Sequence, residues 1–399
     1  MQHVRSGAGA TASSGLLARF AEVRRRSLQL VEGLSPEDCQ VQSMADASPL
    51  KWHLGHTTWF FETFVLPTLE PDFARFNAGF AHLFNSYYNG VGTMHARPLR
   101  GLLTRPDLET VLSYRAHVDA AVERLCASSD PARWAELLEL GLQHEQQHQE
   151  LMLTDLLHAF SCNPMQPAYR SMPPARVADV PLHWRRVEAG LRMIGHAGDG
   201  FAFDNELPRH RVWLDAFEMA SRPVTNAEYR AFIEDGGYRD PLLWLSAGWA
   251  QVQDEGWQRP MYWSEDNRHA FGLHGLQPLQ PHAPVCHLSY YEADAYARWA
   301  GAGLPTEAQW EVAMAVHDAD LAAAGQVWEW TSSAYAAYPG FRPAAGAIGE
   351  YNGKFMCGQY VLRGGSAATP PGHGRLTYRN FFPPSARWQF SGLRLVREL

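Results

Sequence analysis

The sequence predicts a two-part protein of the α plus α+β class, in which a four-helix bundle precedes a loop-rich α+β domain. Residues before 179 contain 10 of the 33 glycines and 3 of the 14 tryptophans, so the second part is richer in both. Apolar residues recur at helical spacing in the first part, whereas short apolar runs broken by Gly, Pro and Asn fill the second. A length of 399 residues suits two domains.

Four segments of the first part carry the helical pattern. The third follows Pro106 and Asp107, which suit the start of a helix, and the fourth is interrupted by no Pro and by the single glycine Gly141. Four helices within about 160 residues indicate a bundle. The predicted helices are Leu16–Leu34, Pro49–Val65, Leu108–Leu125 and Arg133–Phe160.

The proline-rich segment Met172–Trp184 interrupts this pattern, and we place the domain boundary there. Residues 1–14 are then a flexible N-terminus, 15–178 the bundle and 179–399 the α+β domain. In the second part, helices are predicted at Asn226–Asp235 and Tyr290–Ala300. Short strands are predicted in the runs GLRMIG, RHRVWLDAFEMA, VCHLSY, YVLRGGS and FSGLRLVRE.

Charge and hydropathy exclude two classes of partner. The chain has 34 Lys and Arg against 42 Asp and Glu, a net charge of −8, and no basic segment that would neutralise nucleic-acid phosphates. No apolar stretch approaches the roughly 18 residues of a membrane-spanning helix, and the first fourteen residues lack the apolar core of a secretion signal. We therefore expect a cytoplasmic protein without nucleic-acid or membrane partners.

Cysteines offer neither a disulfide framework nor a zinc knuckle, because they are odd in number, scattered and without a C-x-x-C pair. The five are Cys39, Cys126, Cys162, Cys286 and Cys357. The chemistry is more readily sought among the 18 histidines.

The sharpest local feature is the pair His144 and His148 in the fourth predicted helix. Residues four apart lie one turn apart on the same face, and the apolar stripe of Leu137, Leu140 and Leu151 turns that face inward. Buried imidazoles need partners for their ring nitrogens, and a shared metal ion supplies them to both. The favoured interpretation is that both histidines bind one metal ion. The alternative is that they are core histidines held by hydrogen bonds.

A third ligand is expected from the second helix. His56 follows Trp52 by one turn on the predicted inner face, whereas His53 is rotated from that face by about 60°. His56, His144 and His148 therefore form the candidate metal site. Three histidines with open positions beside them suit Zn(II) and Fe(II) equally well.

H-E-x-x-H is also the signature of zinc metalloproteases, in which Glu145 would be the general base. The following QELMLTDLLHAF has no G-x-x-H continuation, and the second domain has no evident protease role. A zinc hydrolase and a non-enzymatic metal-binding module are therefore minor alternatives.

Longer motifs indicate a family. HEQQHQELMLTDLL and KWHLGHTTWFFETF resemble DinB-like helical bundles. PVTNAEYRAFIEDGGY, GLPTEAQWEVA, GQVWEWTSSAY, VLRGGS and SGLRLVRE resemble the successive signatures of the formylglycine-generating-enzyme, C-type-lectin-like fold. The combination covers nearly the whole chain and resembles the EgtB-type iron(II)-dependent sulfoxide synthases of ergothioneine biosynthesis, with FNSYYNGVGTMHARPLRGLL as a specific match.

This resemblance implies that His56, His144 and His148 bind Fe(II). It also implies a reaction in which O2 is used to join hercynine, a trimethylated histidine, to cysteine or γ-glutamylcysteine as the sulfoxide. Three neutral imidazoles leave positions on the iron for thiolate, hercynine and O2. The second domain is expected to complete the substrate pocket, and the oligomeric state is not predicted.

Three further features acquire roles from the resemblance. Tyr87 and Tyr88 resemble the tyrosine pair of one subgroup and become candidate proton donors, although on the sequence alone packing aromatics are the simpler interpretation. Gln147 resembles the glutamine that contacts the substrate carboxylate. Substrate-binding roles for the trimethylammonium group fall to the YRNFF residues Asn380, Phe381 and Phe382.

The thiol donor is less well indicated. Arg97 and Arg100 offer cations for the extra carboxylate of γ-glutamylcysteine, but solvated loop arginines are the preferred interpretation. The tyrosine-pair subgroup favours free cysteine.

Related enzymes on the same scaffold are the main rivals. Ovothiol-type synthases act on histidine, whose free amine calls for carboxylates rather than the aromatics of YRNFF, and selenoneine synthases use a selenosugar. Formylglycine generation itself is disfavoured, because this activity needs paired cysteines and the second domain has only Cys286 and Cys357. Three departures from the family pattern, Gly303, Ala367 and a shortened loop before Gln326, leave the predicted ligands intact.

Overall fold

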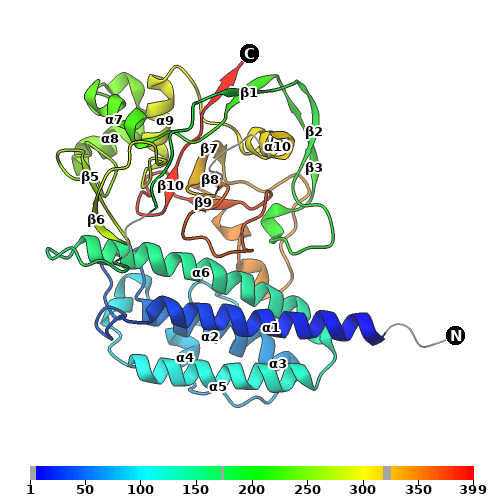
Figure 1. Cartoon of the computed structure of the whole chain (residues 1–399). Helices are drawn as coiled ribbons and strands as arrows, with labels where there is room; N and C mark the ends of the chain where they lie inside the picture. Colours follow the sequence, from blue (N-terminus) through cyan, green and yellow to red (C-terminus); the bar gives the residue numbers. More distant parts are fainter. Residues whose placement is uncertain (1–5, 172–174, 318–324) are drawn as a thin grey trace. The chain divides into compact units, whose positions relative to one another are not determined.

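The computed structural model describes residues 6–171, 175–317 and 325–399 (Figure 1). They fall into two compact units, the first being Met1–Cys162 with Gly346–Ile348 and the second Asn163–Ala345 with Gly349–Leu399. The predicted loop shortening before Gln326 falls mostly at 318–324, outside the described residues. Within the described ranges no helix combines the length and apolarity needed to cross a membrane.

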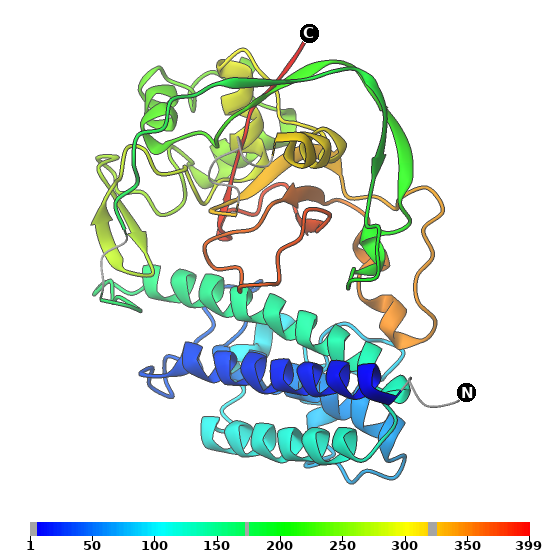
Figure 2. The same cartoon turned by 45° about the vertical axis from the view of Figure 1, so that its right-hand side comes forward.

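The first unit is a helical bundle, and its four long helices confirm the four predicted ones. Helix α2 packs against α5 and α6, and α1 packs against α6 (Figures 1 and 2). The helices are α1 (Ser6–Val31), α2 (Leu50–Phe60), α3 (Leu66–Leu69), α4 (Phe80–Leu83), α5 (Leu108–Ala127) and α6 (Ala135–Ser161). A π-helical segment (Phe61–Val65) joins α2 to α3, and 3-10 turns form at Arg97–Leu102 and Pro131–Arg133.

Helix α2 is the central element of the bundle. All eleven of its residues are buried, including Lys51, whose ammonium group donates a hydrogen bond of 2.8 Å to the Leu103 carbonyl oxygen. A helix that is surrounded in this way has no solvent face. Both His53 and His56 therefore lie inside the bundle, although only one of them was predicted to point inward.

Residues 6–14 were predicted to belong to a flexible N-terminus, but α1 begins at Ser6. The prediction relied on the absence of an apolar stripe before Leu16. Extending an existing helix requires no new nucleation, and the segment contains Ala8, Ala10 and Ala12, the residue type with the highest helix propensity.

The second unit combines short strands, helices and long loops, as predicted. Its helices are α7 (Asn226–Glu234), α8 (Ser246–Glu255), α9 (Tyr290–Trp299) and α10 (Glu307–His317), with 3-10 turns at Asp204–Glu206, Pro241–Leu243, Ala347–Glu350 and Gly353–Phe355. Its strands are β1 (Trp184–Val187), β2 (Gly190–Ile194), β3 (His210–Leu214), β4 (Phe217–Ala220), β5 (His269–Gly272), β6 (Gly275–Pro278), β7 (Trp328–Ala334), β8 (Tyr360–Arg363), β9 (Asn380–Phe382), β10 (Ser391–Gly392) and β11 (Val396–Glu398).

The strands form a four-stranded sheet of order β10-β7-β8-β9, a three-stranded sheet of order β1-β4-β11 and two hairpins. Helix α10 packs against strands of both larger sheets and contributes Trp310 and Ala313 to a core shared with Phe217 and Met219. Strand β9 lies at the end of the four-stranded sheet, where Phe381 pairs with Val361 of β8. This pairing sets the position of the YRNFF segment.

The prediction of a strand at VCHLSY is wrong. No strand forms there, and α9 begins at Tyr290. Ser289 and Glu292 form a capping box, in which the serine hydroxyl accepts from the Glu292 N–H group and the carboxylate accepts from the Ser289 N–H group. This S-x-x-E signature starts a helix and overrides the β tendency of the apolar residues before it.

A pH dependence of stability follows from His287 of the second unit. Its Nδ1–H group donates to the Gln389 carbonyl oxygen at 3.0 Å, and burial lowers its pKa to about 4. The unfolded chain takes up this proton near pH 6.5, so the stability present above that pH is lost as pH falls towards 4. One such group contributes a slope of about 1 kcal/mol per pH unit.

Urea unfolding of the full-length protein at pH 7.5, 6 and 4.5 checks this prediction. His287→Asn keeps a donor for the Gln389 carbonyl and suits the positive φ of 64°, but it cannot titrate. We expect the variant to lose less stability than the wild type over this range. Parallel losses in the two proteins would contradict the assignment.

Candidate metal centre

Three buried histidines converge in the first unit. His56 comes from α2 and His144 and His148 from α6, and one ring nitrogen of each lies within 4.8 Å of those of the other two. The Nε2 atoms of His56 and His144 are 3.1 Å apart. The structure therefore brings together the three residues that the sequence predicted as ligands.

Two glycines allow this convergence. A Cβ atom at Gly55 would lie 2.2 Å from the ring of Phe84, and one at Gly141 would lie 2.5 Å from the ring of Phe61. The first glycine lets the Phe84 segment approach α2 beside His56, and the second lets α6 approach the π-helical segment. Larger residues would separate the elements that carry the histidines.

The three imidazoles are neutral at pH 7. Burial lowers the pKa of His144 to about 3, and burial together with the neighbouring imidazoles lowers the pKa values of His56 and His148 well below their ordinary value. Neutral rings keep the lone pairs that a metal requires. The nitrogen donor set suits both Fe(II) and Zn(II), so a transition-metal ion fits these residues without its identity being decided.

Hydrogen bonds hold two of the rings. Nδ1–H of His56 donates to the Phe84 carbonyl oxygen at 2.6 Å, which leaves Nε2 as the bare nitrogen. Trp52 stacks on the His56 ring with centroids 4.7 Å apart and an interplanar angle of 11°. The Nδ1 atom of His148 lies 2.7 Å from Nδ1 of His53, whose Nε2 lies 3.0 Å from Oδ2 of Asp155.

Sequence reasoning missed the hydrogen-bonding roles of His53, which contacts His148, and of Asp155, which contacts His53. His53 was considered only as a weaker ligand, because a single inner face was assumed for α2. Asp155 follows His148 by seven residues, which places it two turns further along the same face of α6, and this spacing was the available signal.

Glu145, the candidate base of a metalloprotease, is held in an ion-pair network. Its carboxylate accepts from Arg24 at 2.8 Å, from Ser27 at 2.5 Å and from Arg115. Burial alone would raise the pKa of Glu145, but Arg115 and Arg24 lower it to about 2. A carboxylate so engaged is a poor proton acceptor, which argues against the metalloprotease interpretation.

The predicted tyrosine pair lies among aromatic rings. Tyr88 is fully buried and packs against Trp59 and Phe64, with centroid distances of 5.6 and 5.2 Å. Tyr87 is half-buried and stacks on Tyr88 at 4.6 Å. Trp59 in turn stacks on His56 at 5.6 Å, so aromatic contacts connect the pair to the metal centre. The assignment of Tyr87 and Tyr88 as proton donors stays a prediction.

The two candidate arginines differ in environment. Arg97 is exposed, as expected of a solvated loop residue, whereas Arg100 is only 2% exposed, which corrects that interpretation for Arg100. Its guanidinium carbon lies 3.3 Å from the ring centroid of Trp52, and its nitrogens donate to the hydroxyls of Ser48 and Ser86 at 2.8 and 3.1 Å. Burial lowers the pKa of Arg100 to about 8. Within the described residues no carboxylate lies at ion-pair distance from this cation.

Gln147 is half-buried and directly precedes His148 on α6. Asn380, Phe381 and Phe382 lie on strand β9 of the second unit, and all three are half-buried. Phe381 stacks on Tyr335 with centroids 4.0 Å apart and an interplanar angle of 10°. These four assignments stay predictions.

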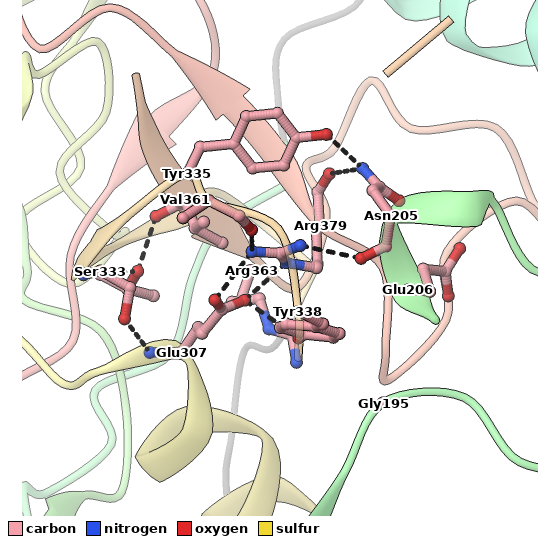
Figure 3. A network of polar contacts seen from close by, with 12 residues as sticks. Gly195, Asn205, Glu206, Glu307, Ser333, Tyr335, Tyr338, Val361, Arg363 and Arg379 are labelled. Atoms are coloured by element: carbon pink, nitrogen blue, oxygen red, sulfur yellow. Dashed lines mark hydrogen bonds and ion pairs between the residues drawn. The ribbon is translucent and has the colours of Figure 1, made fainter. Parts of the chain in front are cut away.

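A buried polar network surrounds Tyr335, the ring on which Phe381 stacks; Figure 3 shows the network around Tyr335. Arg379 donates to both carboxylate oxygens of Glu307, at 2.8 and 2.9 Å, and to the Asn205 carbonyl oxygen at 2.8 Å. The Asn205 side-chain amide donates to the Tyr335 hydroxyl at 2.9 Å. Asn205 thus links Tyr335 to the ion pair of Arg379 and Glu307, which holds the Tyr335 ring in place under Phe381.

Comparisons with known proteins cover both units. The DinB superfamily model matches residues 19–152, and the sulfatase-modifying factor enzyme 1-like domain model matches residues 184–322 and 319–399. Both matches agree with the predicted fold class, a helical bundle followed by a mixed domain.

Two relatives that match this chain over nearly their whole length are both hercynine oxygenases, and a third protein matches over part of its length. A hercynine oxygenase of Mycolicibacterium thermoresistibile is 32% identical over 96% of this chain and 94% of its own length. Another from Mycobacterium tuberculosis is 31% identical over 98% of this chain and 100% of its own length. Ergothioneine biosynthesis protein 1 of Schizosaccharomyces pombe is 26% identical over 49% of this chain and 28% of its own length. The chain belongs to the hercynine oxygenase family.

Proposed function

We propose that this protein is an iron(II)-dependent sulfoxide synthase that uses O2 to form a C–S bond between hercynine and a cysteine-type thiol in ergothioneine biosynthesis. The product is the hercynylcysteine sulfoxide. Membership of the hercynine oxygenase family supports the substrate and the class of enzyme. The observation that carries the proposal is the buried cluster of three neutral histidines.

His56, His144 and His148 would hold the metal. Bound there, Fe(II) would supply the redox chemistry that O2 requires and would favour the thiolate form of the thiol. The chain supplies three neutral donors and burial, which excludes bulk water from the imidazoles. Because the histidines carry no charge, they leave the positive charge of the ion available to an anionic substrate.

We assign Arg100 to the carboxylate of the thiol substrate. Among the described residues this buried guanidinium forms no direct ion pair, so it is suited to binding the carboxylate of a ligand. The exposed Arg97, three residues earlier, is the candidate for the second carboxylate of γ-glutamylcysteine. Free cysteine requires only the buried cation.

Hercynine presents a trimethylammonium group, which is held best by aromatic faces and amide oxygens. We assign this group to Phe381, Phe382 and Asn380, because Phe381 belongs to a rigid aromatic stack on strand β9. Gln147 is assigned to the hercynine carboxylate, which its side-chain amide can bind as a donor.

Mass spectrometry of the products tests this function. The protein is loaded anaerobically with Fe(II) and exposed to O2 with hercynine competing against histidine and cysteine competing against γ-glutamylcysteine. We expect a hercynylcysteine sulfoxide. Coupling to histidine would favour an ovothiol-type enzyme, and coupling only with a selenosugar would favour a selenoneine synthase. Absence of every coupled product from fully loaded protein would refute the proposal.

Tyr87→Phe is expected to retain iron but to lower sulfoxide formation by about 10²-fold or more, because a phenol proton donor is lost. Thiol dioxygenation should rise relative to coupling. Iron content and the ratio of sulfoxide to cysteine sulfinate are the measurements. Tyr88→Phe, at the fully buried neighbour, is the matched control and should change the ratio less. An unchanged rate and ratio in the Tyr87 variant would remove this residue from the reaction.

A further inference from the structure

A chain of two hydrogen bonds leads from the outer nitrogen of His148 to a carboxylate. His53 lies between the Nδ1 atom of His148, at 2.7 Å, and Oδ2 of Asp155, at 3.0 Å. All three residues are buried, with exposures of 9% for His148, 2% for His53 and 6% for Asp155. Neither His53 nor Asp155 has a role in the function proposed above.

The chemistry of these groups sets the direction of the chain. A carboxylate only accepts hydrogen bonds, so Nε2 of His53 must carry the hydrogen that points to Asp155. The two Nδ1 atoms are close enough to share one hydrogen, and when Nδ1–H of His148 donates it, Nδ1 of His53 is the acceptor. It follows that Nε2 of His148 carries no hydrogen and offers its lone pair.

We propose that His53 and Asp155 are positioning residues that fix the tautomer and the ring orientation of His148 for metal binding. The inference rests on the proposed metal centre. A hydrogen bond from the outer N–H group of a metal-binding imidazole to a carboxylate is a general way of orienting the ligand. Here an additional imidazole spans the distance between ligand and carboxylate.

Asp155 is itself held from a second direction. The Ser48 N–H group donates to the same Oδ2 atom at 2.8 Å, and the Ser48 hydroxyl accepts from Arg100 at 2.8 Å. The carboxylate therefore ties α6 to the residues just before α2. Two donors on one oxygen leave this carboxylate little freedom to rotate away from His53.

The ligands differ in how they are anchored. His56 donates to a backbone carbonyl, which no side-chain substitution removes, whereas His148 depends on two side chains. The geometry of His148 can therefore be altered while all three predicted ligands stay in place. The hydrogen-bond chain from His148 through His53 to Asp155, called the relay below, can therefore be tested separately from the ligands themselves.

Four variants test the relay. His53→Leu removes both hydrogen bonds, and Asp155→Ala removes the acceptor at the end of the chain. His53→Asn is the conservative variant, because its amide oxygen can accept from His148. The matched control is His158→Asn, at another buried histidine of α6, whose Nδ1 contacts Ser43 at 2.7 Å. Circular dichroism of the metal-free variants establishes that each is folded.

Anaerobic competition of Fe(II) against a chelator measures affinity, and the electron paramagnetic resonance spectrum of the nitric oxide adduct at saturating iron reports the ligand arrangement. We expect iron affinity to fall about 10- to 100-fold in His53→Leu and in Asp155→Ala, with an altered spectrum. His53→Asn should recover most of the loss, and His158→Asn should resemble the wild type. If His53→Leu does not fold, Asp155→Ala and His53→Asn decide the question.

Wild-type affinity and an unchanged spectrum in both His53→Leu and Asp155→Ala would overturn the relay, as would an equal loss in His158→Asn. A wild-type protein that binds no iron, or binds it equally well after His148→Ala, would overturn the proposed metal centre and the relay with it. The failure of the inference is thus distinguishable from the failure of the proposed function.

Discussion

Replacement of His144 or His148 by alanine is expected to abolish metal retention and turnover together. The three histidines are the group of possible metal donors found among the described residues, and two imidazoles would be left to hold the ion. Each ring is buried, and an alanine at either position offers no donor atom in its place. Metal content after desalting and the rate of sulfoxide formation are the two measurements.

The control for this prediction is His158→Ala on the same helix. His158 is also buried, at 8% exposure, and contacts Ser43 rather than the cluster. It should keep its metal and its activity. Full activity in either ligand variant would refute the metal assignment, and loss of metal in the control would show that α6 is generally intolerant of change.

Glu145→Gln is expected to destabilise the bundle by about 3 to 5 kcal/mol, because the substitution leaves the buried guanidinium of Arg115 without its ion-pair partner, whereas Arg24 keeps Asp119. Arg24 and Arg115 are 3% and 1% exposed, and both pair with this carboxylate. The neighbouring arginines hold the pKa of Glu145 at about 2. The ionised carboxylate therefore stabilises the folded state fully at pH values above its ordinary pKa, and this stabilisation is lost as pH falls towards 2. Urea unfolding at pH 7 measures the change.

Glu139→Gln provides the matched comparison. Glu139 lies on the same helix and pairs with Arg19, but that arginine is half exposed. Removing a solvent-accessible pair should cost about 0 to 1 kcal/mol. If Glu145→Gln were as stable as Glu139→Gln but inactive, a chemical role for Glu145 would have to be reconsidered.

Local patterns predicted much of the first unit correctly. The four helices follow from apolar spacing, and the i, i+4 arrangement of His144 and His148 follows from the pitch of α6. His56 was correctly preferred as the third member of the cluster. Prediction was weaker where two local tendencies competed, as at VCHLSY, where the capping box of Ser289 prevailed over the apolar run.

Arg100 illustrates a different limit. Arginines in a Pro- and Gly-containing segment are usually solvated, and Arg97 conforms to this expectation. Arg100 instead stacks on Trp52, a residue 48 positions earlier in the chain. Such a contact leaves no periodic trace in the sequence, because it joins two segments whose spacing is set by the packing of other elements.

The amino-acid sequence by itself determined the order of the two domains, the bundle helices, the histidine cluster and, through its long motifs, the family. Each of these depends on short-range spacing or on contiguous residues. The tertiary structure alone decided that α2 is surrounded on every side, which brings His53 between His148 and Asp155. It also decided that Glu145 faces two arginines from other helices. The environment of a buried polar group depends on which distant side chains reach it, and only the packed chain specifies them.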